Sequence, residues 1–161
     1  MKLTIYLLIF LILASCGPSH PTQQAAPAPD TTSTAGTVEN RRQLSESISA
    51  DFNGDGTLDQ AFYKKENETS GIIIHHGATN KAVRIGFGQP FAHLTEFNWV
   101  DYWELVEDSI AYETTFTPDG DVLGSKEVKL LHPSIFVGAE EVGGGLITFR
   151  NGKYEWVHQT D

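Results

Sequence analysis

The apolar residues of this chain recur in short runs whose spacing is typical of strands. Branched aliphatic and aromatic residues alternate with polar ones, and Gly, Asn, Asp or Pro separates one run from the next. Such alternation favours half-buried strands, and no long stretch keeps apolar positions at helical spacing. The predicted strands cover 59–65, 71–76, 82–87, 99–107, 109–117, 126–131, 146–150 and 153–158. We therefore expect an all-β fold, either an antiparallel sandwich or a propeller-blade-like sheet with additions.

Two short segments predict tight reversals between strands. Asn151-Gly152 supplies the two positive-φ positions that a two-residue hairpin requires, between runs 146–150 and 153–158. Pro118 and Gly120 predict a second turn, since Pro presets φ and Gly tolerates the reversal. The glycines at 143–145 have no helix after them that could cradle a phosphate, and we expect a flexible or tightly packed loop there.

The first fifteen residues have the parts of a secretory signal. Lys2 precedes an apolar run over 5–14, which is too short for a membrane span of about 20 residues. The sequence Leu13-Ala14-Ser15-Cys16 resembles the bacterial lipobox. That resemblance implies cleavage before Cys16 and attachment of a lipid to its sulfur. Cys16 is the only cysteine, so it has no disulfide partner within the chain.

Composition divides the rest of the chain into a tether and a domain. Residues 16–42 are rich in Pro, Ser, Thr and Ala and lack aromatic residues, and we expect a disordered tether. Residues 43–161 have the length and apolar content for one core. The net charge of −10 argues against nucleic acid as a partner and against direct docking on anionic lipid. The lipid anchor is therefore the expected membrane contact.

The segment 51–59 has the residue pattern of a calcium loop. Side-chain oxygens occur at its first, third, fifth and ninth positions, with glycine at the fourth and sixth. Alternate carboxylates and an amide can surround a hard cation, and the glycine after the fifth position permits a sharp turn. The candidate ligands are Asp51, Asn53, Asp55, Asp59 and, through its carbonyl, Thr57. The same string could form an acidic turn that binds nothing.

The flanks of this loop distinguish it from an EF-hand. The twelfth position is Phe62 where a bidentate Glu is required, and the flanking residues look extended. The pattern resembles the FG-GAP or VCBS-type repeat of integrin-like β-propellers, in which the loop joins two strands. That resemblance implies direct ligation by Asp59 and a structural Ca²⁺. It covers one copy, over residues 50–62.

Histidine and aromatic residues supply weaker candidates. His75 and His76 are neighbours on a predicted strand, so their side chains point to opposite faces, and core or surface roles are favoured over a shared site. Trp99 and Trp103 are candidates for stacking on a sugar or peptide, although core packing is the more frequent role of such residues.

These features favour a non-enzymatic envelope lipoprotein, facing the periplasm, whose calcium-ordered domain binds an envelope protein or glycan. No acidic run follows Cys16, which is why we expect the periplasmic side. One alternative is a hydrolase of envelope glycan or peptide that uses acidic residues among Asp101, Glu104, Glu107 and Asp108. The other is an immunity or inhibitor lipoprotein.

Overall fold

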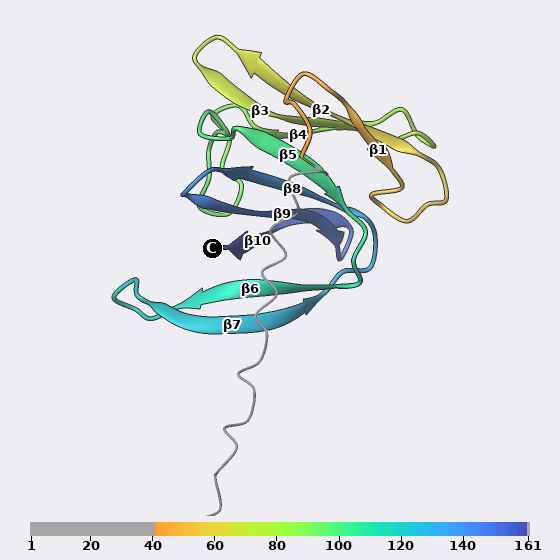
Figure 1. The fold of residues 1–161 in the computed structure, drawn as a ribbon. Coiled ribbons are helices and arrows are strands. Elements are labelled where there is room, and N and C mark those ends of the chain that lie inside the picture. Colours follow the sequence, from red (N-terminus) through yellow and green to blue (C-terminus); the bar gives the residue numbers. More distant parts are fainter. Residues whose placement is uncertain (1–40, 161) are drawn as a thin grey trace, which may run out of the picture. The chain divides into compact units, whose positions relative to one another are not determined.

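The computed structural model describes residues 41–160, and it confirms the all-β prediction (Figure 1). The strands are β1 (Ile48–Ala50), β2 (Asp59–Glu66), β3 (Thr69–His75), β4 (Ala82–Gly86), β5 (Tyr102–Val106), β6 (Ile110–Phe116), β7 (Val122–Lys129), β8 (Ser134–Ala139), β9 (Gly143–Arg150) and β10 (Lys153–Gln159). Within residues 41–160 there is no helix that is long and apolar enough to cross a membrane.

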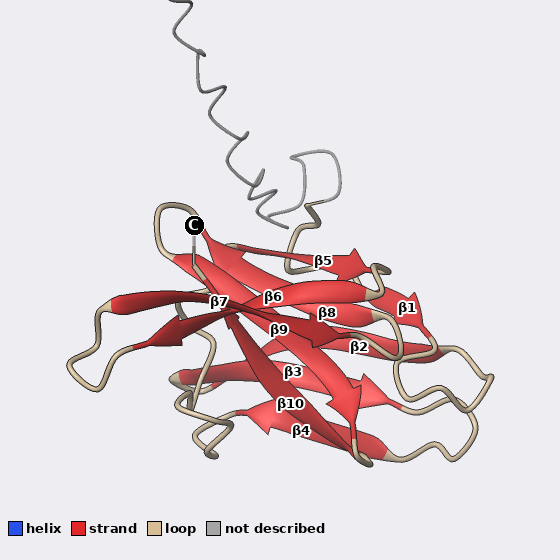
Figure 2. Ribbon diagram, turned by 90° about the horizontal axis from the view of Figure 1, so that it is seen from below, coloured by secondary structure: helices blue, strands red, loops and turns tan. Residues whose placement is uncertain are grey.

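The strands form three antiparallel layers (Figure 1). One four-stranded sheet has the order β1-β2-β3-β4, and a second has the order β10-β9-β8-β5. The hairpin β6-β7 lies across the outer face of the second sheet (Figure 2). The expected antiparallel sandwich is therefore present, with the hairpin as an added third layer.

The main core fills the space between the two sheets. In β2, Ala61 and Tyr63 are buried while Gln60 and Lys64 are exposed, so period-two alternation aims one face inward. Large buried side chains come from both sheets and the loops beside them: Ile48, Phe52, Ile72, Ile74, Ile85, Phe97, Trp103, Ile135, Val137 and Ile147. A second cluster, which includes Ala111, Val128, Phe136, Leu146 and Val157, joins the hairpin to the second sheet.

The middle layer explains one strand that the pattern did not predict. All six residues of β8 are buried, because its sheet is covered on both faces. Such a strand has a continuous apolar run and no alternation.

The glycines at 143–145 were predicted as a loop, which is wrong, since they begin β9. They are needed there for close packing. A Cβ at Gly144 would lie 2.1 Å from the carbonyl oxygen of Val137, and one at Gly145 would lie 2.3 Å from the indole of Trp156.

Both predicted turns are confirmed. Asn151 and Gly152 have φ values of 52° and 79°, and the flanking Arg150 and Lys153 are paired across β9 and β10. The turn at 117–121 joins β6 to β7, with the amide of Gly120 donating to the carbonyl of Thr117 at 3.0 Å.

The two edges of the sandwich differ. At one edge the two sheets are joined, because β1 of the first sheet contacts β5 of the second. The amide of Arg42 also donates to the carbonyl of Trp103 at 2.8 Å. At the other edge, β4 and β10 end their sheets and no pairing joins them in the described part of the chain. The sandwich is therefore open between β4 and β10.

The closed edge also corrects the expected tether boundary. Arg41 and Arg42 were assigned to the tether, but both contact the domain. The guanidinium of Arg41 lies 4.0 Å from the ring centre of Tyr102 and 3.4 Å from a carboxylate oxygen of Glu140. The domain thus includes at least these two arginines.

Candidate metal loop and adjacent cavity

The loop between β1 and β2 folds around the carboxylate of Asp51. Its Oδ1 accepts hydrogen bonds from the amides of Gly54 (2.7 Å) and Asp55 (3.0 Å), and its Oδ2 accepts one from Gly56 (2.8 Å). Both glycines have positive φ, 75° at Gly54 and 85° at Gly56, which explains the residue type at these positions. A Cβ at Gly54 would also lie 2.1 Å from the imidazole of His132.

Asn53 and Asp55 are held against each other inside this loop. The Asn53 Oδ1 accepts from the Asp55 amide, and the Asn53 Nδ2 donates to Asp55 Oδ2, both at 2.9 Å. Asp55 Oδ1 accepts from the amide of Thr57 at 2.9 Å. The hydrogen bond from Asn53, and then that from Thr57, hold the pKa of Asp55 below its usual value. The carboxylate is therefore kept in the ionised form that a cation requires.

Asp59 joins the loop to the turn that follows β3. It is fully buried, its Oδ2 accepts from the amide of Phe52 at 3.1 Å, and its Oδ1 accepts from the amide of Gly77 at 3.0 Å. A buried carboxylate is tolerated when its oxygens are hydrogen-bonded in this way. Asp59 thus stabilises the loop whether or not an ion is bound.

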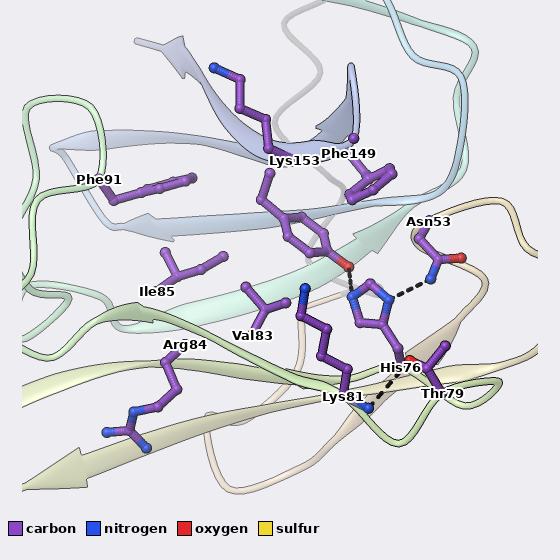
Figure 3. A pocket seen from close by; sticks show the side chains of 12 residues that line it. Asn53, His76, Thr79, Lys81, Val83, Arg84, Ile85, Phe91, Phe149 and Lys153 are labelled. Atoms are coloured by element: carbon purple, nitrogen blue, oxygen red, sulfur yellow. Dashed lines mark hydrogen bonds between the residues drawn. The ribbon is translucent and has the colours of Figure 1, made fainter.

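His76 connects the loop to the second sheet (Figure 3). Its Nδ1 contacts Nδ2 of Asn53, and its Nε2 lies 3.2 Å from the hydroxyl of Tyr154. Because Asn53 Oδ1 accepts from a backbone amide, its Nδ2 is the donor to His76 Nδ1. We assign the imidazole proton to Nε2 on this basis.

The structure brings two of the predicted carboxylate ligands together with one histidine. Ligand atoms of Asp55, Asp59 and His76 all lie within 4.8 Å of one another. Asp51 and Asn53 form the same turn through their hydrogen bonds, whereas Thr57 is exposed and contributes its amide to Asp55. Burial, followed by the charges of Asp59, Asp51 and Asp55, raises the pKa of Tyr154, which reflects the negative charge gathered here.

Sequence reasoning assigned no site role to His76. The predicted opposition of the histidines is confirmed, since His75 is exposed and His76 is buried. Strand alternation could show that one histidine faces inward. It could not show that the turn after β3 packs against the loop before β2.

A cavity of about 560 Å³ lies beside this loop at the open edge of the sandwich (Figure 3). Three residues that line the cavity also contact one another: Asn53 contacts His76, and His76 contacts Tyr154. The remaining lining residues come from the turn after β3, from β4, from the loop that follows β4 and from the hairpin β9-β10: Thr79, Lys81, Val83, Arg84, Ile85, Phe91, Phe149, Gly152 and Lys153.

No protein-family model, curated protein or solved structure matches this chain. What the domain binds therefore has to be inferred from its own residues.

The two tryptophan candidates lie in different environments. Trp103 is fully buried and its Nε1 donates to the carbonyl of Gln43 at 3.1 Å, so its ring offers no surface to a ligand and its predicted binding role is wrong. Trp99 is half-buried and stacks on Phe97, with ring centres 6.4 Å apart. Trp103 instead occupies the core position that its size favours.

The acidic residues of the hydrolase alternative are also divided. Glu104 is buried within β5, whereas Asp101, Glu107 and Asp108 are exposed. Only three of the four therefore reach solvent.

Proposed function

We propose that this chain is a lipid-anchored protein of the bacterial envelope, whose β-domain binds Ca²⁺ in the loop 51–59 and binds an envelope protein or glycan without catalysis. The convergence of Asp51, Asn53, Asp55 and Asp59 in one loop is the observation that carries the proposal. Without a cation, three carboxylates in one turn repel one another, and a bound divalent ion removes that repulsion.

The donor atoms favour a hard cation. The Nδ1 lone pair of His76 already accepts a hydrogen bond from Asn53, so the groups left for an ion are mainly carboxylate and amide oxygens. Oxygen sets suit Ca²⁺, whereas imidazole ligands suit Zn²⁺. Magnesium demands a tighter octahedron and resists dehydration, and we expect it to bind more weakly.

The anchor is supported by the sequence Leu13-Ala14-Ser15-Cys16. Cys16, the signal and most of the proposed tether lie outside the described residues. A separately folded β-domain after residue 40 is consistent with a protein held at a membrane surface by its lipid. We propose a periplasm-facing location for it.

Thermal and urea unfolding with and without calcium tests the ion-binding part of the proposal. For a site with a Kd on the order of 0.1–1 mM, 2 mM calcium adds about 0.6–1.8 kcal/mol to the free energy of unfolding. That corresponds to a rise of a few degrees in Tm for a domain of this size. Magnesium at the same concentration should have a smaller effect.

Asp55→Ala should remove the calcium effect while the domain still folds, because Asp55 is exposed. Asp119→Ala, which changes an exposed carboxylate in the β6-β7 turn, is the matched control. This variant should still be stabilised by calcium. A wild-type protein that unfolds identically in EDTA and in calcium would show that the loop is only a turn.

A further inference from the structure

We propose that the cavity between β4 and β10 binds a carboxylated sugar of the uronic acid class, presented by an acidic envelope glycan. The inference rests on the proposed non-catalytic glycan binding and names the ligand class and its site. At the open edge of the sandwich, β4 and β10 are not paired with each other in the described residues, and a cavity of about 560 Å³ lies there. That volume is within the range of about 300–1,000 Å³ that is usual for small-molecule sites.

The charge of the cavity wall is opposite to that of the chain. The chain has 21 acidic and 11 basic residues, yet the charged side chains that line the cavity are Lys81, Arg84 and Lys153, with no carboxylate among the lining residues. A cationic wall on an acidic protein favours an anionic ligand.

Lys81 is the cation best placed to meet that ligand. Arg84 is engaged by Glu66 at 2.7 Å, and the ammonium of Lys153 lies 3.4 Å from Glu155. No ion pair holds Lys81 in the described part of the chain, and its side chain lines the cavity (Figure 3).

The turn after β3 fixes the position of Lys81. Its carbonyl accepts from the amide of His76 at 2.8 Å, and its amide donates to the hydroxyl of Thr79 at 3.3 Å. The lysine therefore starts from a backbone that is held in place beside the cavity.

The rest of the wall suits the body of a sugar. Val83, Phe91 and Phe149 supply apolar surface, and Phe149 packs edge-on against Tyr154 with ring centres 5.1 Å apart. The C–H face of a pyranose can pack on such surface, while its hydroxyls can hydrogen-bond the side chain of Thr79.

Simpler ligands match only part of this wall. A purely apolar molecule would leave the ammonium of Lys81 without a partner, and a bare anion would leave Val83 and Phe91 uncovered. A sugar carboxylate satisfies both the cation and the apolar surface.

Calorimetric titration of the purified full chain in detergent tests the inference. The probes are trigalacturonate, its neutral counterpart galactotriose, and inorganic phosphate. All titrations contain calcium, so that the nearby carboxylates of the loop are neutralised, and a parallel series contains EDTA. We expect trigalacturonate to bind at least tenfold more tightly than either of the other two probes.

Lys81→Gln should lower the affinity for trigalacturonate about tenfold or more, since hydrogen bonds to charged groups are among the stronger ones. Lys129→Gln, which changes an exposed lysine on β7, should change the affinity less than twofold. Lys81→Arg should retain most of the binding. Both lysines are exposed, and a melting curve of each variant verifies that it folds.

Four outcomes would overturn the inference: no binding of trigalacturonate, equal binding of trigalacturonate and galactotriose, phosphate binding as tight as that of trigalacturonate, or equal losses in Lys81→Gln and Lys129→Gln. The ion-binding proposal is judged separately by the calcium-dependent melting of the same protein. Stabilisation by calcium without uronate binding rejects the cavity inference alone. Lys81-dependent uronate binding without stabilisation by calcium supports the cavity inference and rejects the ion-binding proposal.

Discussion

The amide of Asn53 donates a hydrogen bond to Nδ1 of His76, so a histidine in the turn after β3 orients a side chain in the loop before β2. The same amide donates to Asp55 Oδ2, and its oxygen accepts from the Asp55 backbone. His76 in turn contacts the hydroxyl of Tyr154 on β10. The amide oxygen that a cation would bind is thus positioned by a chain of groups from both sheets.

Replacing His76 by Phe should weaken calcium binding about tenfold or more, which is the usual cost of losing a partner that orients a metal ligand. Phe keeps a ring in the buried position and removes both nitrogen contacts. Calorimetric titration with calcium measures the change. His75→Phe, which changes the exposed histidine at the end of β3, is the matched control and should bind like the wild type. Wild-type affinity in His76→Phe would mean that Asn53 needs no such support.

Asp59→Ala should destabilise the domain even in EDTA, by about 1–3 kcal/mol, because that is the usual cost of an unsatisfied buried amide. The buried amide concerned belongs to Phe52, whereas Gly77, which also donates to Asp59, is exposed and its amide can turn to water. Urea unfolding measures the loss. Asp55→Ala in the same buffer should retain nearly the wild-type free energy of unfolding, since Asp55 is exposed. Equal losses in the two variants would show that Asp59 has no structural role apart from the ion.

Strands could be predicted where one face is exposed or where a turn signal marks their ends. β2 and the hairpin β9-β10 show alternation or a turn signal that acts over a few residues. β8 was missed because burial on both faces removes alternation, and the third layer that buries it depends on where the distant hairpin β6-β7 packs. The glycines at 143–145 were misassigned for the same reason, since their neighbours Val137 and Trp156 are known only from the fold.

The candidate site divides in the same way. The turn around Asp51 is local, and its residue pattern was sufficient to predict which side chains gather there. His76, Lys81 and Lys153 reach the site from other strands and turns, so no spacing rule could group them. Trp103 looked like a binding residue because a sequence does not show which face of a sheet is covered.

A chain that begins at Gln43 should be less stable than one that begins at Arg41, by about 1–2 kcal/mol. The loss combines the hydrogen bond of Arg42 to Trp103, worth about 1 kcal/mol, with the cation–π contact of Arg41 on Tyr102, worth about 0.5–1 kcal/mol. The ion pair with Glu140 adds little at the surface. Urea unfolding of the two shortened chains measures the difference. Equal urea midpoints for the two chains would show that the folded domain begins at residue 43.

Cys16→Ala should abolish lipidation, because the thioether can form only on that sulfur and the chain has no other cysteine. We expect an uncleaved precursor to accumulate and the fraction in membranes to fall. Mass spectrometry of the amino-terminal peptide decides the matter. Ser15→Ala, which keeps a small residue before the cysteine, is the control and should be processed normally. An unmodified Cys16 thiol in the mature wild-type protein would reject the anchor.

The free energy of unfolding should fall as the pH is lowered from 7 to 5, and His158 should contribute to that fall. Burial, and then the charge of His93, lower the pKa of His158, although Glu113 opposes them. Its ring packs edge-on against Phe116, with ring centres 5.2 Å apart. A histidine with a lowered pKa in the folded state takes up a proton more readily when unfolded. Protonation near its ordinary pKa of about 6.5 therefore favours unfolding, and the stability is greatest above that pH.

His158→Phe should flatten this part of the stability profile, measured by urea unfolding at pH 7, 6 and 5. The measurements stop at pH 5 because arginine partners lower the pKa values of Glu66 and Glu155. The stability that these two carboxylates contribute is lost only in more acidic solution. His75→Phe, which replaces an exposed histidine, is the control and should retain the decline. If His158→Phe lost as much stability between pH 7 and pH 5 as the wild type, the burial of His158 would not be a source of the acid sensitivity.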